Sequence, residues 1–502
     1  MYILTDKQMR KADEYTITES GVPSATLMNR AGLALAQEAE KMTQGGKILC
    51  VCGGGNNGGD GFVCARELSV RGFETEVLCR AEKFSEDCAR NKEEWLKRGG
   101  KILTELQEEN YALVIDCLVG TGLKGALRGE TENLVNQIEM LRKKGAKVLS
   151  ADIPSGVCGE NGLTYGKAVH ADKTLCIGER KVGAFFADGL DCAGEVLRAD
   201  IGIKLPEKEY AQLLDGSTVC AFLPVRRRNS HKGSYGKVAI VGGSIEYTGA
   251  PYLSACACLR SGAGYTTLFI PKNLLPYYIA KQPELLLKST NDGDRYVFGE
   301  ENLQELCTYD SVAFGMGMGV SKETYKGVKG LLERYTGKLV LDADGLNSLA
   351  VYGKEEIQSL FAKKKCDVVL TPHCKEFFRL SGKEMKEIQE EGIYAPQAFA
   401  KSLEATVLLK SASSVITDGV RTFVNATGNS GQAKGGSGDV LAGVIAGLCG
   451  SGASAFYAAC AGAYLVGLSA EEGVKEVGEY ALTATDIIKN IGKAFLKVLP
   501  QS

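Results

Sequence analysis

The sequence predicts an α/β protein made of two doubly wound domains, and three observations support this fold class. Short apolar segments alternate with helical segments along nearly the whole chain. Most apolar segments end in a glycine-rich or polar loop, and the chain contains 62 glycines. At 502 residues it is too long for one ordinary domain. Such alternation is typical of parallel sheets covered by helices on both faces.

The first half opens with a helical region and then alternates. Residues 6–43 have helical periodicity, with a break at Gly21-Val22-Pro23-Ser24, which is a turn and N-cap signal. The pattern after this region predicts three helices, at 61–71, 85–98 and 132–144. Between them it predicts strands at 47–52, 74–79, 112–117, 147–152, 174–177 and 195–197.

A basic and polar stretch from Pro206 to about Lys232 interrupts this alternation. We place the domain boundary there, giving domains at 1–215 and 223–500, and interpret Arg226-Arg227-Arg228 as a solvated connector. The second half then predicts a helix at 250–261 and a further strand-like run at 421–425. Its other predicted strands are 237–241, 266–270, 311–314, 339–342, 367–370 and 405–410.

Composition excludes several classes of function. The net charge of −2 gives no electrostatic case for binding nucleic acid or a membrane surface. No signal-peptide pattern and no apolar run of about 20 residues are present, so we expect a cytoplasmic protein. The 17 cysteines form no CxxC pairs and there are only three histidines. Reduced core thiols are therefore expected rather than a zinc site.

The stretch from Ala433 to Asp439 carries the first candidate chemistry. It follows a strand-like run and opens an apolar helical segment, so its glycine amides could converge on an anion at a helix N-terminus. Asp439 could then take a proton from an attacking hydroxyl. A glycine-rich turn with Asp439 as the helix N-cap explains this stretch equally well.

Three strand-end loops of the first half bring oxygen ligands together. The first, from Gly53 to Asp60, contains the G-x-G-x-x-G pattern, so an NAD-binding Rossmann domain stays open. Its asparagines and aspartate also suit a hard cation. Asp116 leads into the second loop and Asp152 into the third, which suggests one pocket. Capping at turns explains any one loop easily and the three together poorly.

In the second half no segment matches the Walker phosphate-binding pattern. Phosphoryl transfer by an amide nest and a base remains possible. Lys410, Asp344, Asn347 and His373 lie at other strand ends and could line the same cleft. A lone histidine in a loop is more often a surface residue than a catalyst.

Taken together, the motifs resemble one family across nearly the whole chain. The second half is similar to ribokinase-like carbohydrate kinases, through Gly436-Ser437-Gly438-Asp439. The whole chain resembles the bifunctional NAD(P)H-hydrate repair enzymes, which join a YjeF N-terminal-type, Rossmann-like epimerase domain to a ribokinase-like, ADP-dependent dehydratase domain. The matching segments are 56–60, 116–126, 152–156, 230–233, 247–251 and 433–439.

The resemblance implies a role for each matching residue. In the epimerase domain the hydrated nucleotide would be bound by Asn56, Asn57, Gly58, Gly59, Asp60, Gly120, Thr121, Gly122, Leu123, Lys124, Gly125, Ala126 and Asp152. A potassium ion would be held by Asn57, Asp116 and Ser155. In the dehydratase domain the substrate would contact Ala250, Gly317, His373 and Asp439. ADP would be bound by Lys410, Ser411, Ala412, Ser413, Ser414, Asn429, Ser430, Gly431, Gln432, Ala433, Lys434, Gly435, Gly436, Ser437 and Gly438.

The mechanism expected from this resemblance is dehydration through a transient phosphate ester. Asp439 would deprotonate the C6 hydroxyl of hydrated NADH or NADPH, which attacks the terminal phosphate of ADP with help from magnesium. Asp152 is the candidate acid/base for exchange of the R and S epimers, with a potassium or ribose ligand role nearly as favoured. The expected partners are these small molecules and further copies of the chain in a homo-oligomer. A vitamin-precursor kinase with a non-catalytic nucleotide-binding N-terminal domain is the alternative.

Overall fold

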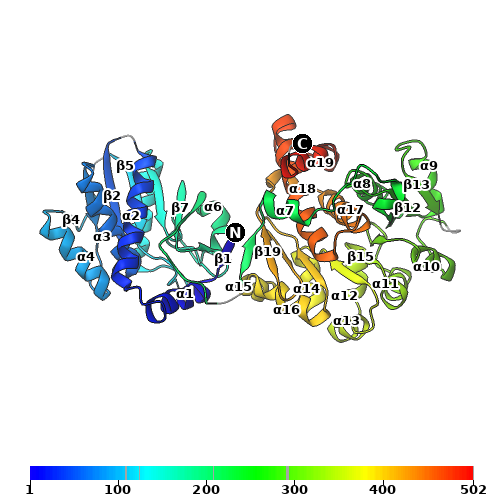
Figure 1. Ribbon diagram of the computed structural model, residues 1–502, viewed down its shortest axis with the longest axis horizontal. Coiled ribbons are helices and arrows are strands. Elements are labelled where there is room, and N and C mark those ends of the chain that lie inside the picture. The colour runs from blue at the N-terminus through cyan, green and yellow to red at the C-terminus, as the bar shows by residue number, and fades with distance from the viewer. Residues whose placement is uncertain (44, 108–109, 124, 207–208, 290–292, 501–502) are drawn as a thin grey trace. The chain divides into compact units, whose positions relative to one another are not determined.

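The computed structural model describes the chain except residues 44, 108–109, 124, 207–208, 290–292 and 501–502. The described residues form two compact units (Figure 1). One spans Tyr2–Tyr210 together with Gln389–Gly392, and the other contains the remaining residues from Ala211 onward and Met1. The domain limits expected from the sequence, 1–215 and 223–500, stay a prediction. No described helix is long and apolar enough to cross a bilayer.

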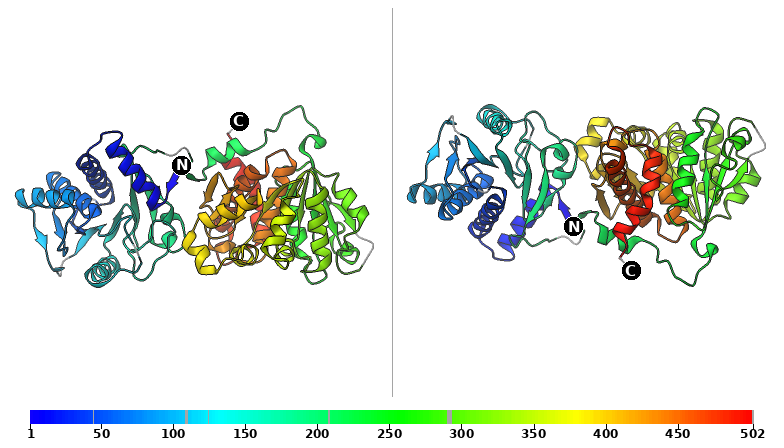
Figure 2. Two further views of the ribbon diagram at one scale, coloured as in Figure 1. Left: turned by 90° about the horizontal axis from the view of Figure 1, so that it is seen from below. Right: turned by 90° about the horizontal axis from the view of Figure 1, so that it is seen from above.

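The first unit is a parallel sheet with helices on both faces (Figure 2). The strand order is β4-β3-β2-β5-β6-β7-β9, and every neighbouring pair is parallel. The strands are β2 (Lys47–Cys52), β3 (Thr75–Leu78), β4 (Ile102–Leu103), β5 (Tyr111–Cys117), β6 (Lys147–Ala151), β7 (Lys173–Ile177) and β9 (Glu195–Ala199), with a separate parallel pair β1 (Tyr2–Leu4) and β8 (Arg180–Lys181). The helices are α1 (Asp6–Thr18), α2 (Ser24–Met42), α3 (Asn56–Val70), α4 (Glu86–Lys97), α5 (Gly129–Lys143) and α6 (Gly189–Cys192).

Alternate residues of β2 explain the two helical layers of this unit. Ile48, Cys50 and Cys52 pack with α2, α3 and α4, whereas Leu49 and Val51 pack with α5. Because successive side chains of a strand point to opposite faces, a continuous apolar run buries both faces of the sheet.

The start of α3 differs from the sequence expectation. The predicted helix began at Gly61, and Asn56–Asp60 was assigned to a loop, but these residues form the first turn of α3. Close packing explains the glycines. A Cβ on Gly58 would lie 1.9 Å from the Gly53 carbonyl oxygen, and one on Gly59 would lie 2.5 Å from the Met28 sulfur. The glycines therefore let the helix approach its neighbours, which the sequence pattern alone did not reveal.

The second unit is a mixed sheet. Its order is β13-β12-β11-β14-β15-β16-β17-β18-β19-β10, antiparallel only at β17-β18 and β18-β19. The strands are β10 (Ala211–Leu213), β11 (Lys237–Val241), β12 (Tyr265–Ile270), β13 (Leu286–Ser289), β14 (Ser311–Phe314), β15 (Lys338–Leu341), β16 (Asp367–Leu370), β17 (Thr406–Leu409), β18 (Ser414–Thr417) and β19 (Thr422–Asn425). The sequence analysis did not identify β18.

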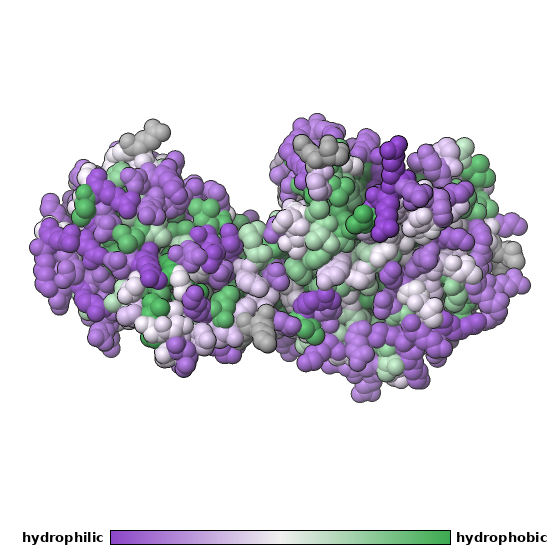
Figure 3. Space-filling model, in the orientation of Figure 1, coloured by the Kyte–Doolittle hydropathy of each residue, from purple (hydrophilic) through white to green (hydrophobic). Residues whose placement is uncertain are grey.

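Helices cover this sheet as well. They are α7 (Gly216–Phe222), α8 (Gly249–Leu259), α9 (Leu275–Tyr278), α10 (Glu300–Leu306), α11 (Lys322–Arg334), α12 (Asp344–Ala350), α13 (Gly353–Phe361), α14 (Cys374–Ser381), α15 (Met385–Glu391), α16 (Tyr394–Leu403), α17 (Ser437–Gly450), α18 (Ala455–Val477) and α19 (Ala484–Val498). The α8, α17, α18 and α19 helices share one apolar core with the strands. On the visible face of the molecule, polar residues predominate and apolar ones form small patches (Figure 3).

Candidate functional sites

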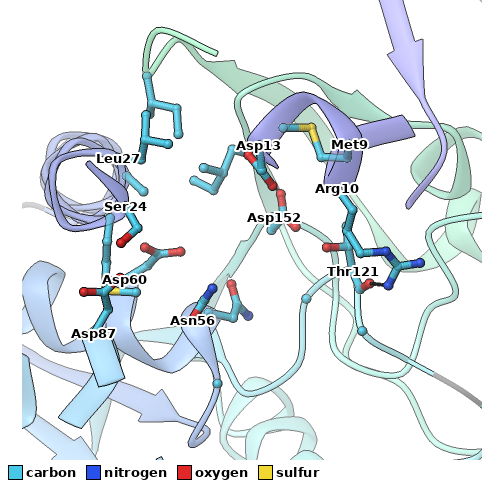
Figure 4. A pocket seen from close by; sticks show the side chains of 18 of the residues that line it. Met9, Arg10, Asp13, Ser24, Leu27, Asn56, Asp60, Asp87, Thr121 and Asp152 are labelled. Atoms are coloured by element: carbon cyan, nitrogen blue, oxygen red, sulfur yellow. Dashed lines mark hydrogen bonds between the residues drawn. The ribbon is translucent and has the colours of Figure 1, made fainter. Parts of the chain in front are cut away.

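A cavity of about 580 Å³ opens at the carboxyl ends of β2, β5 and β6 in the first unit (Figure 4). Ligands bind at this edge in open α/β sheets. The predicted residues on its wall are Asn56, Asn57, Asp60, Gly120, Thr121, Gly122 and Asp152. The structure thus brings residues that follow three separate strands into one pocket.

The other residues predicted for this site that the structure describes do not line the cavity. Gly58 and Gly59 are buried in the packing of α3, as described above. Leu123, Gly125 and Ala126 belong to the same loop as Gly122 but do not line the described cavity, and Lys124 lies outside the described residues. Contacts of these residues with a nucleotide stay predictions.

Asp152 is held by a strained backbone and a buried lysine. It follows β6 with φ +70°, a left-handed conformation that non-glycine residues rarely adopt and that is concentrated at functional sites. Its Oδ1 accepts a hydrogen bond from the Ile177 amide at 3.1 Å and forms an ion pair with Lys181. Lys181 also donates to the Ile177 and Glu179 carbonyl oxygens at 2.6 and 3.0 Å.

Lys181 lines this cavity, and the sequence analysis did not identify it. It is 1% exposed. Burial lowers the pKa of its ammonium, but the neighbouring Asp152 carboxylate outweighs this effect, and the pKa rises above its ordinary value. Lys181 lies four residues beyond β7, so extending the strand-end argument to that strand would have pointed to it.

Three further aspartates line the cavity, Asp13, Asp60 and Asp87. Burial raises the pKa of Asp13 to about 6 and that of Asp60 well above its usual range. Asp13 comes from α1, together with Arg10, whose guanidinium donates to the Thr121 carbonyl oxygen at 3.2 Å. No sequence pattern pointed to either α1 residue, because their helix joins the site only through tertiary packing.

The three residues expected to hold potassium divide into a pair and a single side chain. Asp116 and Ser155 are completely buried against each other, with Ser155 Oγ donating to Asp116 Oδ1 at 2.6 Å. Asp116 also accepts bonds from Ser150 Oγ and from the Ser155 and Leu118 amides. Asn57 lines the cavity, and among the described residues no partner bonds to either polar atom of its side chain.

These donors fit a hard cation better than a transition metal. Amide, carboxylate and hydroxyl oxygens are ligands for hard cations. In the described part of the chain no cluster of three or more histidine, cysteine, aspartate or glutamate side chains could hold a metal. The orphaned Asn57 oxygen is the observation that favours a cation here.

In the second unit, Asp439 lies in the first turn of α17. The N-cap of this helix is Gly436, with φ +98°, and Asp439 does not cap it, so the interpretation of Asp439 as an N-cap is wrong. Burial raises the pKa of Asp439 to about 7, and the neighbouring Asp342 contributes in the same direction. Ser254 on α8 donates to the Asp439 carbonyl oxygen at 2.7 Å and ties α8 to the start of α17.

An ion pair between the half-buried Lys410 and the buried Asp342 lies beside this turn. Lys410 Nζ donates to Asp342 Oδ1 at 2.7 Å, and Asp342 is 2% exposed. A Cβ on Gly438 would lie 3.3 Å from Lys410 Nζ, so the ammonium lies close to the start of the helix. Burial lowers the pKa of Lys410, but Asp342, Glu376 and Asp439 keep it above its ordinary value. The sequence analysis did not identify Asp342 or Glu376.

The remaining strand-end residues are His373, Asp344 and Asn347. His373 accepts the Lys375 and Glu376 amides at 3.1 and 3.2 Å, so it caps α14. Burial and then Lys410 lower the pKa of its imidazole. Asp344 accepts the Gly319 amide at 2.8 Å, whereas Asn347 bonds to Arg379.

Two of the predicted substrate contacts, Ala250 and Gly317, are neighbours. A Cβ on Gly317 would lie 3.3 Å from the Ala250 Cβ, and Gly317 has φ +69°. The structure therefore joins the loop after β14 to the start of α8, at the same sheet edge as Asp439.

The predicted ADP segments are anchored by their own polar groups. Lys434 Nζ donates to the Leu482 carbonyl oxygen at 2.8 Å, and Asn429 accepts the Gly431 amide at 3.0 Å. Ser411 and Ser414 bond to each other across the turn between β17 and β18. Gly435 has open space around its α carbon.

Comparison with known proteins gives matches over both units. A family model described as NAD(P)H-hydrate dehydratase matches residues 238–493, and one described as YjeF-related protein N-terminus matches residues 24–183. Proteins named bifunctional NAD(P)H-hydrate repair enzyme are similar over almost their whole length. The one from Moorella thermoacetica is 36% identical, covering 97% of this chain and 95% of its own. The one from Thermofilum pendens is 34% identical, covering 98% and 96%.

The second unit is also similar to a solved structure. The ADP/ATP-dependent NAD(P)H-hydrate dehydratase of Bacillus subtilis, co-crystallised with ATP and Mg²⁺, is 27% identical. The match covers 57% of this chain and 99% of that chain, with a TM-score of 0.50.

Proposed function

This chain belongs to the bifunctional NAD(P)H-hydrate repair enzymes, and on that premise we propose that it restores hydrated NADH and NADPH to the usable coenzymes. It is an enzyme with two activities, an NAD(P)H-hydrate epimerase in the first unit and an ADP- or ATP-dependent NAD(P)H-hydrate dehydratase in the second. The observation that carries the dehydratase assignment is the half-buried Asp439 carboxyl at the start of α17, beside the Lys410–Asp342 pair.

For the dehydratase, Asp439 is the proposed base. The C6 hydroxyl of the S epimer transfers its proton to Asp439, and its oxygen attacks the terminal phosphorus of ADP, which releases AMP. The lone pair of the ring nitrogen then breaks the C6–O bond and expels phosphate, and loss of a C5 proton restores the double bond. Magnesium bound with the nucleotide supplies charge neutralisation. Lys410 contributes a fixed positive charge where negative charge develops.

We propose the residues that contact the nucleotide from their positions near the start of α17. The amides of Gly435, Gly436, Ser437 and Gly438 at the N-terminus of α17 suit a phosphate group. Ser411–Ser414 and Asn429–Lys434 would hold the rest of ADP, and Ala250, Gly317 and His373 the hydrated coenzyme. The anchoring hydrogen bonds of Lys434 and Asn429 support this assignment, because they fix the backbone of that segment.

For the epimerase, Asp152 is the proposed acid/base that helps the C6 hydroxyl leave and return. Its left-handed backbone and its ion pair with Lys181 support this role. We also infer that Asn57, Asp116 and Ser155 hold a potassium ion, which would supply positive charge near the bound nucleotide. Replacing potassium by tetramethylammonium should then weaken substrate binding by the first unit without affecting dehydration. Equal affinity in both salts would refute the potassium assignment.

One incubation tests the overall proposal. The full chain is mixed with both epimers of hydrated NADH, with ADP, ATP or no nucleotide, while NADH absorbance and the epimers are followed. We expect complete recovery of NADH with nucleotide and epimer exchange without it. A lasting phosphorylated product would instead indicate a small-molecule kinase. We infer a cytoplasmic location from the 17 free cysteine thiols, most of which are buried. Assembly into a homo-oligomer stays a prediction.

A further inference from the structure

The first unit carries a second buried carboxyl group on the other side of the cavity from Asp152. Figure 4 shows open space between Asp60, which comes from α3 and lies near Ser24 and Leu27, and Asp152 with its neighbour Asp13. Asp60 and Asp152 are each 9% exposed, and both line the cavity. The geometry therefore places Asp60 and Asp152 on two facing walls of the cavity.

The two carboxyl groups differ in their partners. Asp152 has an amide donor and the Lys181 ammonium. Among the residues that the structure describes, none donates a hydrogen bond to the Asp60 side chain or forms an ion pair with it. Burial therefore raises the pKa of Asp60 well above its usual range; Asp152 and Asp13 push it in the same direction, and only Lys181 opposes them. Asp60 is thus suited to hold a proton, whereas Asp152 already has a cationic partner in Lys181.

We propose that Asp60 is a second catalytic residue of the epimerase, which protonates the hydroxyl leaving one face of the hydrated ring while Asp152 deprotonates the water that adds to the other face. This inference rests on the proposed epimerase function. Inversion at a single carbon needs proton transfer on both faces, and a carboxyl on each wall of one cavity supplies that arrangement.

The step balances as follows. The Asp60 proton moves to the C6 hydroxyl oxygen, the C6–O bond breaks, and water leaves. The ring-nitrogen lone pair forms the N1–C6 double bond, which gives a planar cation between two carboxylates. A water molecule on the Asp152 side then attacks C6, its proton passes to Asp152, and the nitrogen recovers its lone pair. The product is the opposite epimer, with Asp60 ionised and Asp152 protonated, ready for the reverse reaction or for exchange with solvent.

Asp13 cannot take the place of Asp60 in this scheme. Its carboxyl lies beside Asp152 in Figure 4, and the charges that act on it are those of Lys181 and Asp152. It therefore belongs to the Asp152 wall. The backbone of α3 also fixes Asp60 in place, because Gly59 and Gly61, on either side of it, pack against Met28, Cys52 and Cys117 with no room for a Cβ.

The test compares Asp60→Asn with Asp191→Asn, the same change at an exposed aspartate of the same unit, in the full chain. Exchange of pure R and S epimers is measured without nucleotide. We expect kcat for Asp60→Asn to fall by about 10²–10⁴-fold in both directions with little change in KM, and Asp191→Asn to match the wild type. A raised KM with normal kcat would show that Asp60 only binds substrate, and would overturn the proposal.

A second variant guards against misfolding. Asp60→Ala leaves space for a small carboxylic acid, so added formate should restore exchange in proportion to its concentration if Asp60 transfers a proton. Loss of activity without rescue, in a chain whose thermal unfolding matches the wild type, would overturn the proposal. A wild-type chain that fails to accelerate exchange at all would instead refute the epimerase function itself. Normal exchange in Asp60→Asn with an active wild type would refute only the role of Asp60.

Discussion

The two units build their sites from the same parts but connect them differently. Each has an aspartate just after a parallel strand and a lysine paired with it: Asp152 with the buried Lys181 in the first, Asp342 with the half-buried Lys410 in the second. A strained non-glycine residue with positive φ marks both places, Asp152 itself and Ala343. In the first unit the paired aspartate is the proposed acid/base. In the second, the proposed base is Asp439, which comes from a helix start.

This difference shows that the strand end determines where charge is placed, but not which residue reacts. Lys181 forms an ion pair directly with Asp152, whereas Lys410 is paired with Asp342, and Asp439 keeps a pKa raised to about 7. A base with such a pKa changes its protonation near neutral pH, where general bases are most effective. Four changes test the comparison, from the largest expected effect to the smallest.

Asp439→Asn removes the proposed base of the second unit alone. We expect NADH recovery from the S epimer to fall by about 10²–10⁴-fold, because an amide cannot accept the hydroxyl proton. Epimer exchange by the first unit of the same chain is the internal control and should not change. Dehydration at near-normal rate, measured by NADH absorbance, would contradict the assigned role.

Lys181→Met removes one partner of a buried ion pair. Leaving Asp152 as an uncompensated buried charge should lower the free energy of unfolding of the first unit by about 3–5 kcal/mol and stop epimer exchange. Lys173→Met is the matched control, because Lys173 makes more exposed pairs with Glu38 and Glu195, and should cost under about 1 kcal/mol. Denaturant unfolding measures the loss of stability in both variants. Equal losses would show that the buried and the more exposed ion pairs do not differ in their contribution.

The pH dependence of dehydration should follow the ionisation of Asp439. The base must be ionised, so kcat/KM should rise about tenfold per pH unit below the raised pKa of about 7 and level off above it. The groups acting on Asp439 are Asp342, Lys410 and Asp344, all in the same unit. A profile that is flat between pH 5 and 8 would show that Asp439 is already ionised throughout, contrary to its burial.

Gly436→Ala should perturb the start of α17 more than Gly435→Ala. Gly436 has φ +98°, and a Cβ there would lie 2.8 Å from the Ala484 Cβ, whereas a Cβ on Gly435 meets open space. The left-handed conformation alone costs about 1–2 kcal/mol for a non-glycine residue. Thermal unfolding of the two variants provides the comparison, and equal stability would show that this turn relaxes freely.

The sequence by itself determined the fold class, the two sheets and the loops that carry Asp116, Asp152 and Asp439. It could do so because strand and helix periodicity and glycine-rich strand ends are local properties of the chain. It also indicated that the loops after β2, β5 and β6 share one pocket, since parallel strands end at one edge.

Only the tertiary structure decided which charges meet. Lys181 and Asp13 reach Asp152 from β8 and α1, and Lys410 pairs with Asp342 across 68 residues of sequence. The raised pKa values of Asp60 and Asp439 likewise come from burial, which depends on packing around the side chain rather than on neighbours in the chain. Local sequence patterns carry no record of such long-range contacts, so the assignment of acid and base depended on the folded molecule.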